Sequence, residues 1–113
     1  MDIIPASTIY ELKGSSVKLP CDDAIKHSFV RKLEWKCRGC FSISETRESR
    51  LAVFENDEAV SLAYPERFHI AMANYSLAVQ LLENSDSGTY FCMVNSRNTP
   101  TNMYKLAVQG KYF

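Results

Sequence analysis

The sequence lacks net charge, long apolar runs and a secretion signal. Its 13 basic and 13 acidic side chains cancel, so nothing electrostatic favours nucleic acid or an anionic membrane as a partner. No apolar run approaches the roughly 18 residues of a membrane-spanning helix. The start of the chain, residues 1–3, also lacks the basic and apolar regions of a signal peptide. We therefore expect that Met1 was added for expression, and that the natural protein carries a leader before it and a stalk or membrane span after Phe113.

Residues that carry catalysis or hold metals are also scarce. His27 and His69 are the only two histidines, and we expect one in a loop and one on a strand, facing solvent or a sheet edge. The acidic segments 22–23 and 55–58 lack the alternating carboxylates around a glycine that a calcium loop needs. No Ser, Thr or Cys has an evident base to activate it. The sequence thus predicts no enzyme activity, no cofactor and no metal site.

The apolar residues that are present follow a period of two. Short β-branched and aromatic segments alternate with Gly, Pro, Asn and Asp, and no helical period extends over a dozen residues. The fold class is therefore all-β. A chain of 113 residues is long enough for one two-layer core, so residues 1–113 are expected to form a single domain. The expected strands cover residues 8–13, 16–21, 29–37, 50–54, 59–62, 67–71, 76–82, the stretch after Gly88, and 103–109.

One stretch, Asp-Ser-Gly-Thr-Tyr-Phe-Cys at 86–92, organises the rest of the chain. After its glycine the strand alternation sends Tyr90 and Cys92 to one face and Phe91 and Met93 to the other. A tyrosine two residues before a buried cysteine, at the corner where a strand begins, packs its ring inward while its hydroxyl bonds backbone upstream. The stretch therefore predicts a strand with a buried thiol.

Together with Cys21, Trp35 and Arg67, this stretch resembles the variable-type immunoglobulin domain, and the resemblance covers nearly the whole chain. It implies a sandwich of about nine antiparallel strands in two sheets. It also implies a disulfide between Cys21 and Cys92 with Trp35 packed against it, and a pair between Arg67 and Asp86. The long stretch between Trp35 and Arg67 leaves room for the two extra strands of the variable type.

The resemblance implies an extracellular domain, since a disulfide between strands needs an oxidising compartment. It further implies the ligand-binding domain of an immune cell-surface receptor, which recognises a protein through the sheet called GFCC′ and the loop before the last strand. Variable domains of rearranged antigen receptors end in a Gly-x-Gly bulge. Segment 105–110 has no such pair of glycines, so the chain does not resemble a rearranged antigen receptor.

Two subfamilies stay open. An additional disulfide near the Trp35 strand resembles the polymeric immunoglobulin receptor and its leukocyte relatives. Tyr-Phe-Cys at 90–92, followed by a Ser/Asn-rich loop and Met103-Tyr104, resembles the alpha chain of the T-cell co-receptor for class I histocompatibility molecules. The second resemblance implies a homodimer that binds a class I molecule.

The pair Cys37 and Cys40 allows several interpretations. A structural disulfide around the turn at Arg38-Gly39 is favoured, because a redox pair normally begins a helix and no helix is expected here. A single CxxC also supplies only two of the four ligands of a structural zinc. Redox activity, metal binding and an inter-chain bond remain alternatives.

The candidate partner contacts follow from strand parity. Phe91 and Met93 are apolar where a solvent-facing strand should be polar, so we expect a partner to cover them unless side chains such as Phe54 do so within the domain. The neighbouring loop adds turn-forming and hydrogen-bonding side chains: Arg97, Asn98, Pro100 and Asn102. Asn74-Tyr75-Ser76 is an N-glycosylation sequon, so Asn74 is expected to carry a glycan.

Overall fold

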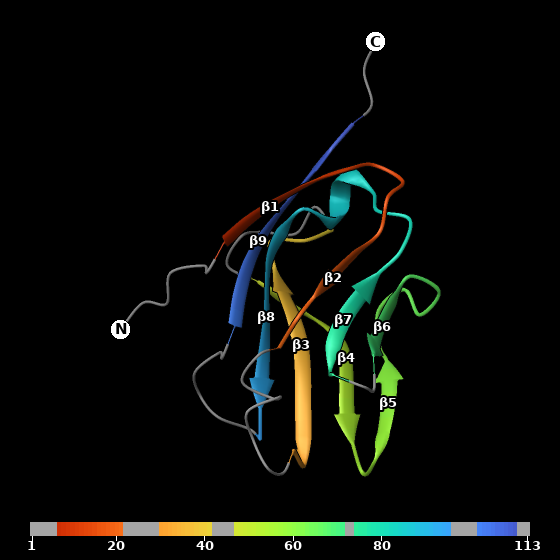
Figure 1. Cartoon of the computed structure of the whole chain (residues 1–113), viewed down its shortest axis with the longest axis vertical. Coiled ribbons are helices and arrows are strands. Elements are labelled where there is room, and N and C mark those ends of the chain that lie inside the picture. The colour runs from red at the N-terminus through yellow and green to blue at the C-terminus, as the bar shows by residue number, and fades with distance from the viewer. Residues whose placement is uncertain (1–6, 22–29, 42–46, 72–73, 96–101, 111–113) are drawn as a thin grey trace.

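The computed structural model describes residues 7–21, 30–41, 47–71, 74–95 and 102–110, and these residues form two β-sheets (Figure 1). The strands are β1 Ser7–Leu12, β2 Val17–Leu19, β3 Lys32–Arg38, β4 Glu48–Glu55, β5 Glu58–Ser61, β6 Phe68–Ala71, β7 Ser76–Val79, β8 Gly88–Val94 and β9 Asn102–Gln109, with a short 3-10 helix, η1 Asn84–Asp86. The larger sheet has the order β1-β9-β8-β3-β4-β5, and the smaller sheet has the order β2-β7-β6. The predicted all-β fold is confirmed. Within the described residues, no helix is long and apolar enough to cross a membrane.

The two sheets pack face to face around one core. In Figure 1 the smaller sheet lies across the larger one. On β3 the side chains of Leu33, Trp35 and Cys37 are fully buried and alternate with partly exposed charged residues. On β7 of the facing sheet, Leu77 and Val79 are also fully buried. This alternation places one face of each sheet in the core and the other in solvent.

One pairing differs from the expected antiparallel arrangement. β1 runs parallel to β9, from Ser7 opposite Tyr104 to Leu12 opposite Gln109, whereas the other strand pairs are antiparallel. Gly14 has a φ of 92°, a conformation that favours glycine, and it lies in the turn that carries the chain from β1 to β2 in the other sheet. β1 therefore pairs with the last strand instead of with β2.

The strand ends show where local backbone conformation overrides the apolar pattern. The strand expected at 76–82 ends at Val79, because Leu81 has a φ of 53° and the Leu82 N–H donates to the Ser15 carbonyl at 2.9 Å. The turn between β4 and β5 contains Asn56 and Asp57 with φ values of 55° and 61°. Two consecutive left-handed residues are what a tight two-residue hairpin turn requires.

A disulfide joins the two sheets at the centre of the core. Cys21, which follows β2, is bonded to Cys92 on β8, with a Cα–Cα distance of 6.1 Å. Trp35 lies opposite Cys92 on β3 and is fully buried. Its Nε1–H donates to the Tyr75 carbonyl at 2.9 Å, and its ring stacks on Tyr104 with centroids 6.5 Å apart. The indole is thus hydrogen-bonded as well as buried, as a core tryptophan requires.

A buried ion pair and a tyrosine form the corner before β8. Arg67 donates two hydrogen bonds to the carboxylate of Asp86, at 2.5 and 3.1 Å, and Asp86 is fully buried. The Tyr90 hydroxyl donates to the Asp86 carbonyl oxygen at 2.5 Å. The hydrogen bond to Asp86 raises the pKa of Arg67, and burial raises the pKa of Tyr90 well above its usual value. Both groups therefore keep their protons in the folded state.

The second disulfide fastens the end of β3 to this corner. Cys37 and Cys40 are bonded to each other, and both are buried. The Phe41 N–H donates to the Ser85 carbonyl at 2.6 Å. A Cβ atom on Gly88 would lie 2.7 Å from Cys40 Sγ and 2.9 Å from Cys37 Sγ. The disulfide thus occupies the space that a side chain at position 88 would need.

We expect Gly88→Ala to lower the free energy of unfolding by about 1–3 kcal/mol, the range for overpacking a filled core. The added methyl group would meet both sulfurs and also the Arg38 carbonyl oxygen, at 2.8 Å. In a Cys37→Ala/Cys40→Ala background only the carbonyl contact remains, so the same substitution should cost less. Urea denaturation of the four proteins measures this coupling, and equal costs in the two backgrounds would contradict the packing described here.

We expect Tyr90→Phe to remove part of the loss of stability at alkaline pH. The unfolded chain releases the tyrosine proton at about pH 10, while the folded chain retains it. The free energy of unfolding therefore falls as the pH rises above this value, by up to about 1.4 kcal/mol per pH unit. The wild type should therefore lose stability faster than Tyr90→Phe above about pH 10. Urea midpoints across this range test the assignment, and parallel pH profiles would refute it.

Candidate functional site

The outer face of the larger sheet, the side turned away from the core, carries a band of charge. Lys32, Glu34, Lys36 and Arg38 alternate with the buried residues of β3, so all four point to the outer face. Their partners across the strand pair on β4 are Glu55, Val53, Arg50 and Glu48. The charges are therefore arranged as neighbours across the strand pair as well as along the strand.

Ion pairs connect the charged side chains of this band. Glu34 accepts a hydrogen bond from Arg50 and lies 3.8 Å from the Lys36 ammonium. Glu48 lies 3.6 Å from Lys36 and 3.0 Å from Arg38. Two carboxylates thus serve three cations. Ion pairs at an exposed surface add little to stability, so these ion pairs chiefly fix the positions of the charged side chains on the outer face.

The two outward apolar residues predicted on β8 are not equivalent. Phe91 points to the outer face but is only 1% exposed, and the Arg38 guanidinium lies 5.4 Å from the centre of its ring. The ring of Phe91 is therefore covered within the domain, beneath Arg38, and is not open to a partner as the sequence predicted. Phe54 does not cover it, since Phe54 packs in the core against Tyr75. Met93 is partly exposed and stays a candidate contact.

Exposed apolar side chains lie at both edges of the outer face. On the β4–β5 edge, Val60 and Leu62 are 50% and 46% exposed and line a shallow hollow of about 340 Å³ with Val53. At the opposite edge, Tyr10 and Leu12 on β1 are 66% and 53% exposed. They alternate with Ile9, which packs on the core. The charged band is thus flanked by apolar surface on both sides.

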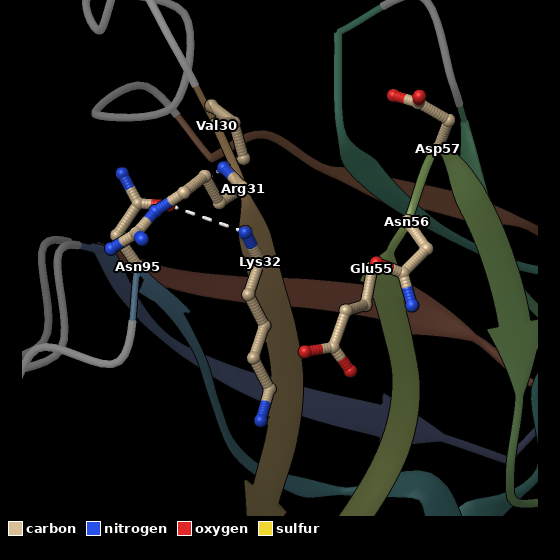
Figure 2. Close-up of a pocket in the computed structure, with 7 residues that line it drawn as sticks. All are labelled: Val30, Arg31, Lys32, Glu55, Asn56, Asp57 and Asn95. Atoms are coloured by element: carbon tan, nitrogen blue, oxygen red, sulfur yellow. Dashed lines mark hydrogen bonds between the residues drawn. The ribbon is translucent and has the colours of Figure 1, made fainter.

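A pocket of about 490 Å³ lies at the end of the face where β3 begins. Figure 2 shows Lys32 and Glu55 next to each other on neighbouring strands, with Asp57 at the turn beyond them. Asn95 forms the other wall, and its side-chain oxygen accepts hydrogen bonds from the N–H groups of Arg31 and Lys32, at 2.8 and 3.2 Å. The pocket is a polar hollow with charges of both signs.

The other predicted site residues belong to the segment before β9 and to the glycosylation sequon. Arg97, Asn98 and Pro100 lie outside the described residues. Asn102 begins β9, where its backbone pairs with Cys92. Asn74 is exposed in the turn between β6 and β7, and its side-chain oxygen accepts a hydrogen bond from the Ser76 N–H at 3.1 Å. Within the described residues, no group of three or more His, Cys, Asp or Glu side chains could hold a metal ion.

The burial of the CxxC pair argues against its redox interpretation. All four cysteines are described and paired. Cys37 and Cys40 are at most 1% exposed and follow a strand, whereas a reactive thiolate needs access and a helix N-terminus or a nearby cation. This disulfide is part of the core.

The charged band is the part of the candidate site that the sequence-based reasoning missed. The alternation of charge around Trp35 was visible in the sequence, but its partners on β4 were not. The strand register shifts between Trp35 and Lys36, so Leu51 and Ala52 are both buried and the outward alternation of β4 changes phase there. A bulge of this kind has no clear signal in a single sequence.

Comparisons with known proteins agree with this architecture. The family model described as immunoglobulin V-set domain matches residues 5–109, and no curated protein matches the chain. Among solved structures, Tim-1 is 19% identical, with 100% of this chain and 98% of that chain covered and a TM-score of 0.72. The extracellular domain of the voltage-gated sodium channel beta4 subunit is 22% identical (99% and 92% covered, TM-score 0.69).

Two further structures have lower sequence identity. The first immunoglobulin-like domain of human CD48 is 15% identical (94% and 84% covered, TM-score 0.70). The CD2-binding domain of CD58 is 17% identical (TM-score 0.63), and although 90% of this chain is covered, the match spans 53% of that chain. At these identities the structures show a shared fold, and the family match covers most of the sequence. The chain belongs to the immunoglobulin V-set family, a family of non-enzymatic domains of receptor and adhesion proteins that are typically extracellular.

Proposed function

We propose that the chain is the ligand-binding domain of an immune cell-surface receptor, and that it recognises a protein partner through the outer face of its larger sheet. The proposal rests on one observation, which is that most of the exposed large apolar side chains lie on this face. Among the described residues, six large apolar side chains are exposed. Four of these are on the outer face: Tyr10, Leu12, Val60 and Leu62.

The outer face also has the composition of a protein-binding surface. Apolar side chains at both edges can be desolvated by a partner, and arginines are enriched among the residues that anchor interfaces. Arg38 is held between the Phe91 ring and the Glu48 carboxylate, so little side-chain entropy would be lost when it meets an acceptor. The proposed contacts are Arg38, Met93, Val53, Val60 and Leu62, and Arg97, Asn98, Pro100 and Asn102 stay in the proposal on the strength of the sequence alone.

The smaller sheet offers a weaker alternative. Its outward residues at the centre of the described strands are Lys18, His69 and Ala78, which are polar or small. Asn74 lies in the turn that joins two strands of this sheet. A glycan at Asn74 would occupy space beside the smaller sheet and leave the outer face of the larger sheet open.

The comparisons support a protein as the ligand. The CD58 structure is described as a CD2-binding domain, and the sodium channel beta4 structures are described as parallel homodimers that explain cell-cell adhesion. A class I histocompatibility molecule, the ligand implied by the co-receptor resemblance, is included as one candidate in the test below.

We expect Val60→Asp and Met93→Asp each to weaken partner binding about tenfold or more, because a buried carboxylate without a partner costs at least about 1.4 kcal/mol. The measurement is surface plasmon resonance of the tetramerised domain over a panel of purified immune cell-surface ectodomains that includes a class I molecule. Leu81→Asp is the matched control, since Leu81 is 63% exposed but follows β7 in the other sheet. A ligand lost with Leu81→Asp and retained with the other two variants would overturn the proposal.

A further inference from the structure

We propose that the end of the outer face where β3 ends binds a linear sulfated polysaccharide of the kind found outside cells. This inference goes beyond the proposed function, because it assigns to the same sheet a second ligand of a different chemical class. Its basis is an uneven distribution of charge over the outer face. The zero net charge of the chain hides this distribution, since cations and carboxylates collect at opposite ends of the face.

A row of side chains without a carboxylate crosses four strands at this end. It runs from Thr8 on β1 through Lys105 on β9 and Thr89 on β8 to Arg38 on β3, and each residue is opposite the next in the strand register. Lys105 is exposed between two buried residues of β9, so its side chain lies on the outer face. Two cations thus alternate with two hydroxyl groups, and all four side chains can donate hydrogen bonds to anionic oxygens.

Two further cations lie one step back along the strands, opposite each other on β3 and β4. We call the four cations the basic end: Lys36, Arg38, Arg50 and Lys105. They extend about 14 Å across the strands, from β9 to β4, and about 7 Å along them. Only two carboxylates, Glu34 and Glu48, form ion pairs with these cations. β3 and β8 separate Glu48 from Lys105, so the basic end keeps an excess of positive charge.

Arg38 is already held in a conformation that suits an anionic oxygen. Its guanidinium lies 5.4 Å from the centre of the Phe91 ring and donates a hydrogen bond to Glu48 at 3.0 Å, yet the side chain remains 41% exposed. A guanidinium has further N–H donors, and their planar arrangement matches the oxygens of a tetrahedral anion. Because packing on the ring limits the motion of the side chain, little entropy would be lost on binding.

The opposite end of the outer face carries carboxylates. Glu55 and Glu58 are opposite each other on β4 and β5, Asp57 lies in the turn between them, and all three are exposed. This hairpin is about 20 Å along β4 from Glu48. An anionic membrane would lie over the whole face and would meet these carboxylates as well as the cations. A linear polyanion can cross the strands at the basic end alone, so the charge distribution favours a chain over a surface.

The basic end also lacks the features of a nucleic-acid site. Single-stranded nucleic acids bind proteins by stacking their bases on aromatic rings. The ring within the basic end, Phe91, is 1% exposed and lies beneath Arg38. A sulfated polysaccharide needs no open ring, because its anionic groups project from a chain of saturated sugars. The hydroxyl groups of Thr8 and Thr89 can bond to sugar hydroxyls as well as to sulfate. A sulfated sugar chain is therefore the ligand that fits.

Binding of the domain to immobilised heparin, measured by surface plasmon resonance, tests the site. We expect a Kd in the micromolar range at about 50 mM NaCl that rises about tenfold or more at about 500 mM, because the contacts join exposed charges. Desulfated heparin and vesicles of phosphatidylserine and phosphatidylcholine should bind more weakly than heparin. Absence of heparin binding at low salt, binding that does not depend on salt, or equal binding to either of the other two ligands would overturn the proposal.

Removal of a carboxylate assigns the site, because it predicts a gain of affinity. Glu48→Gln should lower the heparin Kd about threefold at about 150 mM NaCl, since it removes the carboxylate that pairs with Lys36 and Arg38. Glu58→Gln makes the same change in net charge at the other end of the face and should leave the Kd unchanged, because its distance exceeds the screening length of about 8 Å. Equal effects of the two variants, or no gain with Glu48→Gln, would refute a site at the basic end.

Removal of a cation separates this proposal from the proposed function. Lys105→Ala should raise the heparin Kd about threefold or more, whereas Lys18→Ala, an exposed cation on β2 of the smaller sheet, should not. Lys105 is not among the proposed protein contacts, so binding to an ectodomain should persist in Lys105→Ala. Equal heparin binding by the two variants would contradict the polysaccharide site. A domain that binds an ectodomain through Val60 and Met93 but does not bind heparin would refute the polysaccharide site alone and leave the receptor function standing.

Discussion

The disulfide between Cys21 and Cys92, with Trp35 against it, decides which side of each central strand faces the core. It joins the two sheets across the interior, and the indole beside it is fixed by a hydrogen bond to the Tyr75 carbonyl. Because successive side chains of a strand point to opposite faces, an inward Cys92 requires outward Phe91 and Met93, and an inward Trp35 requires outward Glu34 and Lys36. The packing of this core therefore determines which residues of the central strands lie on the outer face.

The outer face places an exposed charged group over a buried aromatic ring. Phe91 lies beneath Arg38, and Glu48 holds the same guanidinium from the side. An apolar ring thus supports a charged group that remains open to solvent. The corner formed by Arg67, Asp86 and Tyr90 and the Cys37–Cys40 disulfide hold the end of β3 that carries Arg38. Core packing and surface chemistry are connected through this one strand.

The sequence was sufficient for the fold and for much of the core, but only for part of the candidate face. The strand class and the tyrosine corner follow local patterns, whereas the pairing of Arg67 with Asp86 was predicted from the resemblance to the variable-type domain. Phe91 was misjudged because strand parity gives the direction of a side chain and not what covers it. The parallel β1–β9 pair and the shift at Trp35/Lys36 depend on how sheets meet, so no local pattern predicted them.

The most direct test of this account is a disulfide map of the unreduced protein after trypsin digestion with free thiols blocked. Trypsin separates all four cysteines, in peptides 19–26, 37–38, 39–47 and 68–97. The account predicts that 19–26 is joined to 68–97 and that 37–38 is joined to 39–47. A bond from 19–26 or 68–97 to either of the other two peptides would contradict it, because the inward and outward sides of the central strands would then no longer be fixed as described.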